Sequence, residues 1–127
     1  MANKKSVPRP TAAELELLRV IWPLGAATVK QVHEAALPTR PDLTYATVLR
    51  LMQIMHRKRL LKRDDTERSH VYAPAQRQES TRTQLLTELI QKVFAGSGKN
   101  LVMAALRDHV SEQDRREIQH LLDGEKK

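Results

Sequence analysis

Residues 44–72 read TYATVLRLMQIMHRKRLLKRDDTERSHVY, and their pattern predicts a helix followed by a β-hairpin. Thr44 suits the N-cap position of a helix that runs to about Arg59. Apolar residues recur in this helix at three- and four-residue spacing, which predicts one buried stripe of Val48, Leu51, Met52 and Met55. Two short strand-like runs, 60–63 and 70–72, follow around the charged residues 64–68, a pattern that predicts a β-hairpin with a charged tip.

Two further helices are predicted before this stretch. Thr11 and Glu14 have the spacing of a capping box and open an apolar helix that we expect to stop at Pro23. After a short turn, Thr28 can cap a second helix, whose apolar positions continue until Pro38. Three helices followed by a β-hairpin is the element order of a winged helix-turn-helix domain, in which the third helix enters the DNA major groove.

The face of the third helix opposite its apolar stripe carries donors and acceptors that suit base edges in a major groove. That face consists of Thr44, Thr47, Arg50, Gln53, Ile54 and Arg57. An ordinary solvated helix face also explains this pattern, and the hairpin that follows is what favours DNA. Arg68 near the hairpin tip, with Lys62 and Arg63 on its arm, is then expected to hold phosphates.

Charge and composition point to an anionic partner. The 127 residues suffice for one domain with a small helical appendage, and 22 Lys and Arg against 15 Asp and Glu give a net charge of +7. Up to residue 76 there are 13 basic and 7 acidic residues, and beyond it 9 and 8, so the N-terminal half carries the excess. Only four aromatic side chains are present, too few for a series of base-stacking platforms, which favours duplex over single-stranded nucleic acid.

The sequence gives no support for several other classes of protein. Without cysteine there is no disulfide and no thiolate metal site, and the five histidines show no HExxH spacing. Asp64 and Asp65 could act as paired catalytic carboxylates, but on a charged hairpin tip solvated side chains are the simpler interpretation. We therefore expect no enzyme, no catalytic residue, no metal and no cofactor. No apolar run spans a membrane and residues 1–10 lack the apolar region of a signal peptide, so a cytoplasmic, soluble protein is expected.

From Gln78 onward the sequence predicts three more helices. The first two are separated by Gly96-Ser97-Gly98. Ser111 with Asp114 caps the last helix, and Gly124 is expected to end it. Their large apolar residues exceed what so thin an appendage can bury, so a partner surface is expected, most simply a second copy of the chain. Packing of these helices back onto the N-terminal domain is the alternative. The predicted dimerisation residues are Leu85, Leu86, Leu89, Ile90, Val93, Phe94, Leu101, Val102, Leu106, Ile118, Leu121 and Leu122.

Four motifs in register give a resemblance to a known family. Residues 11–22 (TAAELELLRVIW), 28–32 (TVKQV), 45–49 (YATVL) and 71–74 (VYAP) resemble the penicillinase repressor family, and the likeness covers about residues 9–123. The resemblance implies a homodimeric winged-helix repressor that binds a palindromic operator. In many members of that family, a membrane metalloprotease sensor relieves repression by triggering cleavage in the C-terminal dimerisation region.

The resemblance also assigns residues. It places the recognition helix at 44–59, with Thr47 at a DNA-contacting position, and it places the wing arginine at Arg68 and the dimer helix at 85–94. Three departures stand out: Arg59 replaces the usual glycine after the recognition helix, Ala104-Ala105 occupies the expected cleavage position, and the absence of cysteine excludes thiolate copper sensing. The predicted DNA-binding residues are Thr28, Lys30, Thr44, Tyr45, Thr47, Arg50, Gln53, Arg57, Lys62, Arg63 and Arg68.

These observations predict a mainly α protein with a small β-hairpin wing. We expect a flexible arm at 1–10, a winged helix-turn-helix DNA-binding domain at 11–76, and a helical dimerisation region at 77–127. The expected function is that of a sequence-specific transcriptional repressor acting as a homodimer on double-stranded operator DNA. The alternative is a non-enzymatic adaptor that uses its basic surface to bind other proteins.

Overall fold

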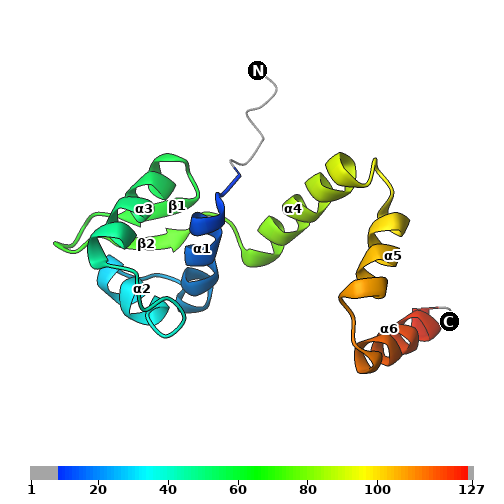
Figure 1. The fold of residues 1–127 in the computed structure, drawn as a ribbon. Coiled ribbons are helices and arrows are strands. Elements are labelled where there is room, and N and C mark those ends of the chain that lie inside the picture. Colours follow the sequence, from blue (N-terminus) through cyan, green and yellow to red (C-terminus); the bar gives the residue numbers. More distant parts are fainter. Residues whose placement is uncertain (1–8, 126–127) are drawn as a thin grey trace, which may run out of the picture. The chain divides into compact units, whose positions relative to one another are not determined.

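A computed structural model describes residues 9–125, and most of the predicted N-terminal arm therefore lies outside the described residues. Within that range the chain is mainly helical with one antiparallel hairpin, as predicted (Figure 1). The elements are α1 (Ala12–Leu24), α2 (Val29–Ala36), α3 (Tyr45–Arg57), β1 (Leu61–Asp64), β2 (Val71–Pro74), α4 (Gln78–Val93), α5 (Gly98–Asp108) and α6 (Glu112–Glu125). They form two compact units, one up to Thr81 and one from Arg82 onward.

The predicted helix starts are confirmed by their caps. The Thr11 hydroxyl accepts from the backbone N–H of Glu14 at 3.2 Å, and the Glu14 carboxylate accepts from the N–H of Thr11 at 2.9 Å. Thr28 caps α2 with the same reciprocal pattern, in which Gln31 takes the second position. Thr44 accepts from the N–H of Thr47 at 3.1 Å at the start of α3. Local hydrogen bonding thus fixes where each of these three helices begins.

The other predicted boundaries of the helices and strands are less accurate. The first helix does not stop at Pro23 but includes it in its last turn, where a proline removes one hydrogen bond without ending the helix, and Gly25 closes the turn with φ 79°. The third helix ends at Arg57 rather than near Arg59, because the chain turns into the left-handed region there. The hairpin strands begin one residue later than predicted, and α6 runs through Gly124 to Glu125.

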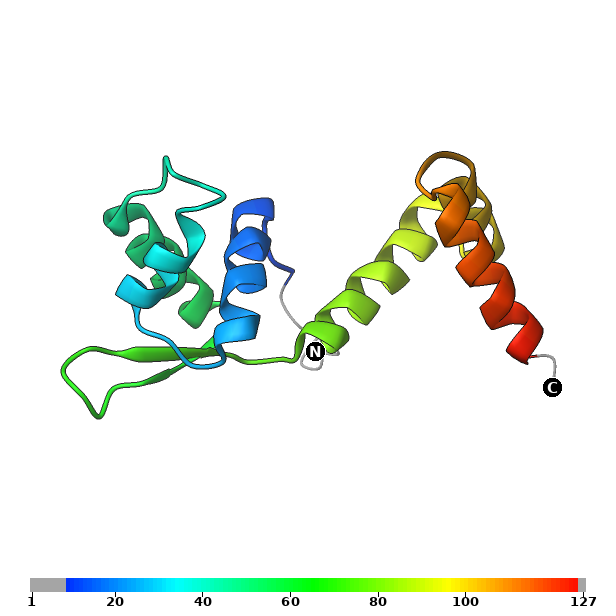
Figure 2. The ribbon, with the colours of Figure 1, turned by 90° about the horizontal axis from the view of Figure 1, so that it is seen from below.

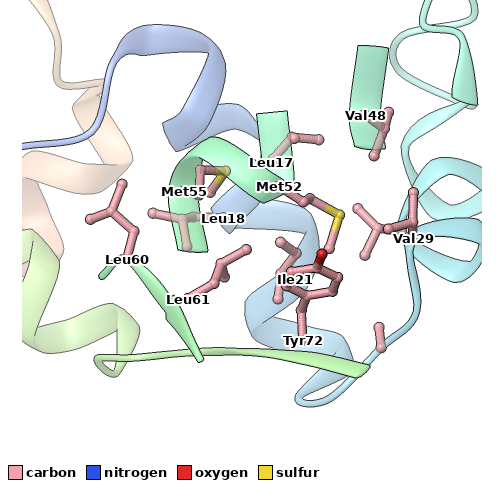
Figure 3. Packing of buried hydrophobic residues seen from close by; sticks show 12 residues of the cluster. Leu17, Leu18, Ile21, Val29, Val48, Met52, Met55, Leu60, Leu61 and Tyr72 are labelled. Carbon is pink, nitrogen blue, oxygen red and sulfur yellow. The ribbon is translucent and has the colours of Figure 1, made fainter. Parts of the chain in front are cut away.

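The core of the first unit lies between α1, α2, α3 and the hairpin (Figure 3). Ile21 of α1 and Met52 of α3 are 0% exposed, and Tyr72 of β2 is 1% exposed. Met55 is buried with them, so the prediction that the two methionines are packing residues is confirmed. Leu51 was predicted in the same stripe but is only half buried, because it sits at the margin of the buried face of α3.

The β1–β2 hairpin forms the wing of the fold. β1 pairs with β2 in a register that places Arg63 opposite Tyr72 and Leu61 opposite Pro74. Figure 2 shows its loop extending beyond the helices of the first unit. Ala27, just before α2, exchanges two 2.8 Å backbone hydrogen bonds with Tyr72. This bridge ties the start of α2 to the wing.

The second unit is built of helices whose apolar residues remain uncovered. Among residues 82–124 no side chain is buried. Half-buried positions are Leu85, Ile90, Phe94, Leu101, Leu106 and Ile118, and exposed ones are Leu86, Leu89, Val93, Val102, Met103, Leu121 and Leu122. The predicted cap of the last helix is confirmed, since the Ser111 hydroxyl accepts from the N–H of Asp114 at 3.0 Å. No helix in the described part of the chain is long and apolar enough to cross a membrane.

Candidate nucleic-acid interface

The outward face of α3 presents polar side chains that are not committed elsewhere. Arg50, Gln53 and Arg57 are exposed, and within residues 9–125 no hydrogen bond or ion pair engages their side chains. Thr47 is half buried, and its hydroxyl accepts from that of Thr44 at 3.0 Å. Ile54, predicted on the same face, is also half buried. The three exposed residues are therefore the ones available to bind base edges, whereas Thr47 is partly used to start the helix.

The turn before α3 is held on both sides. Arg40 donates to Asp42 at 2.8 Å and lies 2.6 Å from the Glu16 carboxylate of α1. The Arg40 guanidinium lowers the pKa of Asp42 to about 2, through their hydrogen bond. Nε2 of His33 lies 2.8 Å from the carbonyl oxygen of Leu43, on the other side of the turn. These contacts fix the N-terminus of α3 against α1 and α2.

The other end of α3 is tied to the start of α1. Nζ of Lys58 lies 2.7 Å from the Glu14 carboxylate, which is 3% exposed. Burial alone would raise the pKa of Glu14, but hydrogen bonds from Lys58 and from the N–H of Thr11 outweigh it and hold that pKa below its usual value. The ion pair thus joins the two helices at a site that water reaches poorly.

Arg59 adopts the backbone conformation for which glycine is usual. Its φ is 69°, in the left-handed region that costs a residue with a Cβ about 1–2 kcal/mol. The N–H of Leu60 then donates to the carbonyl of Met55 at 2.8 Å, which closes the end of α3 and starts the chain towards the wing. The left-handed turn is therefore kept despite the arginine.

The wing tip is organised by its own carboxylates. Asp64 accepts from the N–H of Thr66 at 2.9 Å, and these hydrogen bonds hold the pKa of Asp64 below its usual value. Asp65 lies 2.7 Å from Nε of Arg63. Both carboxylates are exposed, as the interpretation of solvated side chains predicts, and both also make contacts within the loop. Lys62 and Arg68 are exposed, and neither makes an ion pair or side-chain hydrogen bond in the described chain.

A hollow of about 380 Å³ lies between α2, α3 and the wing. Three elements line it: residues 28–30 at the start of α2, then Tyr45, Leu49 and Gln53 one turn apart on α3, and residues 68–70 with Tyr72 on the wing. Lys30 and Arg68 give it positive charge, and no acidic residue lines it. A phosphate group fits a site of this charge and composition.

Comparison with known proteins agrees with this architecture. Residues 10–124 match the model of the family described as penicillinase repressor. The chain belongs to this family. Two curated relatives, the transcriptional regulator BlaI of Mycobacterium tuberculosis strain CDC 1551 / Oshkosh and that of strain ATCC 25618 / H37Rv, are each 39% identical over 71 residues. That alignment covers 55% of this chain and 51% of each relative, so the chain spans about half the length of the curated relatives it matches.

In this penicillinase repressor family member, the predicted DNA-binding residues fall into separate groups. The hollow brings together Thr28, Lys30, Tyr45, Gln53 and Arg68 from three elements that are apart in sequence. It does not include the remaining predicted residues Thr44, Thr47, Arg50, Arg57, Lys62 and Arg63.

Five residues that line the hollow were not among the predicted DNA-binding residues: Val29, Leu49, Ser69, His70 and Tyr72. Leu49 lies four residues after Tyr45 and four before Gln53, so helical spacing could have found it. Ser69 and His70 adjoin Arg68 on the wing, and the Ala27–Tyr72 bridge that joins this part of the wing to the start of α2 has no signal in the sequence.

Proposed function

We propose that this protein is a transcriptional repressor that binds duplex DNA through α3 and the wing. The observation that carries the proposal is the exposed face of α3, where Arg50, Gln53 and Arg57 have no partner within residues 9–125, beside a cationic hollow shared with the wing. An arginine on such a helix suits the two acceptors of a guanine edge, and a glutamine suits adenine. Family membership supports the same function.

The residues divide by the kind of contact they would make. We assign Arg50 and Gln53 to bases, because they project from the middle of the exposed face of α3. We assign Lys30, Lys62 and Arg68 to phosphates, because they stand on the flanking elements as uncommitted cations.

Other predicted residues would act by holding these groups in place. Thr44 and Arg63 already bond within the protein, Thr44 to Thr47 and Arg63 to Asp65. We assign both to positioning α3 and the wing rather than to DNA contact.

The second part of the proposal is that the protein acts as a homodimer on a palindromic operator. Each of α4, α5 and α6 carries exposed large apolar residues, among them Val93 at 65% and Leu121 at 62%. A two-fold dimer that covered them would hold two winged units over half-sites on the same side of the duplex. Binding of the second half-site would then be effectively intramolecular and raise affinity without further base contacts.

Release by proteolysis is not part of the proposal. Ala104 and Ala105, at the position where the family resemblance places a cut, lie inside α5 and are half buried. Proteases cleave exposed and unstructured segments, and a helical backbone does not offer one.

The proposal is tested by competition between the duplex upstream of the protein's own gene and a scrambled duplex of equal length. Wild type should prefer the first, and Arg50→Ala should reduce that preference by roughly 1–3 kcal/mol, as for a lost bidentate base contact. Arg107→Ala, on the exposed surface of α5, is the matched control and should leave the preference unchanged. Equal binding of both duplexes by wild type would contradict sequence-specific recognition.

A further inference from the structure

A second hollow, of about 600 Å³, lies in the first unit where β2 leads towards α4. It is lined by Trp22 and Pro23 at the end of α1 and by residues 74–78. It shares no lining residue with the hollow that we assign to DNA. Its volume is within the range of about 300–1,000 Å³ found for small-molecule sites.

Part of the wall of this hollow is apolar and consists of Trp22, Pro23, Pro74 and Ala75, beside Gln76, Arg77 and Gln78. The Trp22 indole is half buried and held in place, since its Nε1 donates to the carbonyl of Gln76 at 3.0 Å. Pro23 and Pro74 add two rigid rings, and Ala75 adds only a methyl group to the lining. Rigid ring surfaces of this kind bind a planar aromatic group at little cost in side-chain entropy.

The charge at the hollow is positive. Arg77 lines it and is exposed, and within residues 9–125 its guanidinium makes no hydrogen bond or ion pair. No acidic residue is among the lining residues. A guanidinium binds a carboxylate through two parallel hydrogen bonds, and in this position it has no internal carboxylate to compete.

We propose that this hollow binds a small aromatic carboxylate. The ring lies against Trp22 and the two prolines, and the carboxylate pairs with Arg77. The combination of an apolar platform with one uncommitted cation selects an aromatic anion over a neutral aromatic or a simple inorganic anion. This inference does not depend on the proposed DNA-binding function.

The experiment uses the single tryptophan of the chain as a reporter. In a proton–nitrogen correlation spectrum of the full-length protein, the indole Nε1–H gives one signal, and it is followed during titration with 2-naphthoate. The neutral 2-naphthamide serves as the matched probe. Naphthoate should shift the indole signal saturably, with naphthamide binding about tenfold more weakly, because hydrogen bonds to charged groups are the stronger ones.

Two variants distinguish the effect of the Arg77 charge from non-specific binding of the probes. Arg77→Gln should weaken naphthoate binding about tenfold and leave naphthamide binding unchanged, whereas Arg107→Gln on α5 should alter neither. The proposal is overturned if the indole signal does not saturate, if naphthoate perturbs only residues of the second unit, or if Arg77→Gln has no effect. Equal affinity for the two probes would likewise remove the carboxylate from the proposal.

Discussion

Replacing Arg59 with glycine should stabilise the first unit. Arg59 has a φ of 69° and an exposed side chain without a hydrogen bond or ion pair in the described chain. Relief of the left-handed strain should raise the free energy of unfolding by about 1–2 kcal/mol. The greater freedom of glycine in the unfolded chain should lower it by about 0.5–1 kcal/mol. The net gain should be about 0.5–1 kcal/mol, which corresponds to a rise of roughly 2–8 °C in Tm for a unit of this size.

The assay is thermal unfolding followed by Trp22 fluorescence, which reports on the first unit. Arg59→Ala removes the same side chain but keeps the Cβ, so its Tm should stay close to that of wild type. Arg50→Gly makes the same substitution inside α3. It should lower the free energy of unfolding by about 0.8–1 kcal/mol, because glycine has a low helix propensity in a helix interior. A Tm for Arg59→Gly equal to or below that of Arg59→Ala would show that the left-handed backbone at residue 59 stores no strain that glycine relieves.

Four further predictions concern the Lys58–Glu14 ion pair, the wing and the exposed apolar residues of the second unit. Lys58→Met leaves the buried Glu14 carboxylate unpaired and should cost about 1–3 kcal/mol at neutral pH, measured by urea unfolding. Because the pKa of Glu14 is lowered in the folded protein, its stabilisation is present above the unfolded value of 4.5 and is lost as pH falls below it. Glu14→Gln should therefore flatten the acid limb of the stability curve, and an unchanged limb would contradict this. Arg68→Ala should weaken binding to specific and scrambled duplexes alike and reduce the salt slope by about one unit, whereas a sequence-selective loss would place Arg68 on a base edge. The double variant Leu89→Asp, Leu122→Asp should sediment as a monomer with weak operator affinity, and a wild type that already sediments as a monomer yet binds a full operator tightly would refute the dimer.

Sequence reasoning found what depends on neighbouring residues. The caps at Thr11, Thr28 and Thr44 are set by contacts three residues along the chain. Thr11 was found from its spacing to Glu14, and Thr28 and Thr44 from their residue type just before an apolar helical pattern. Met52 and Met55 were placed in the core by helical periodicity. These features are local, so one sequence contains all the information that determines them.

The sequence did not reveal features that depend on distant contacts. The Lys58–Glu14 ion pair joins residues 44 positions apart, and the Trp22–Gln76 hydrogen bond joins residues 54 apart. Neither leaves a periodic signal. The hollow at the wing could not be assembled for the same reason, because the Ala27–Tyr72 bridge sets how the start of α2 meets β2.

The proposed binding of a symmetric DNA site by two copies of α3 is tested most directly by selection from a library of random duplexes. We expect enrichment of an inverted repeat whose half-site centres are about 10 bp or a multiple of it apart, so that both lie on one side of the helix. We also expect Arg50→Ala to lose the preference at one position of each half-site, symmetrically. Enrichment of no motif, or of a single unrepeated site that Arg50→Ala selects equally well, would contradict symmetric recognition by α3.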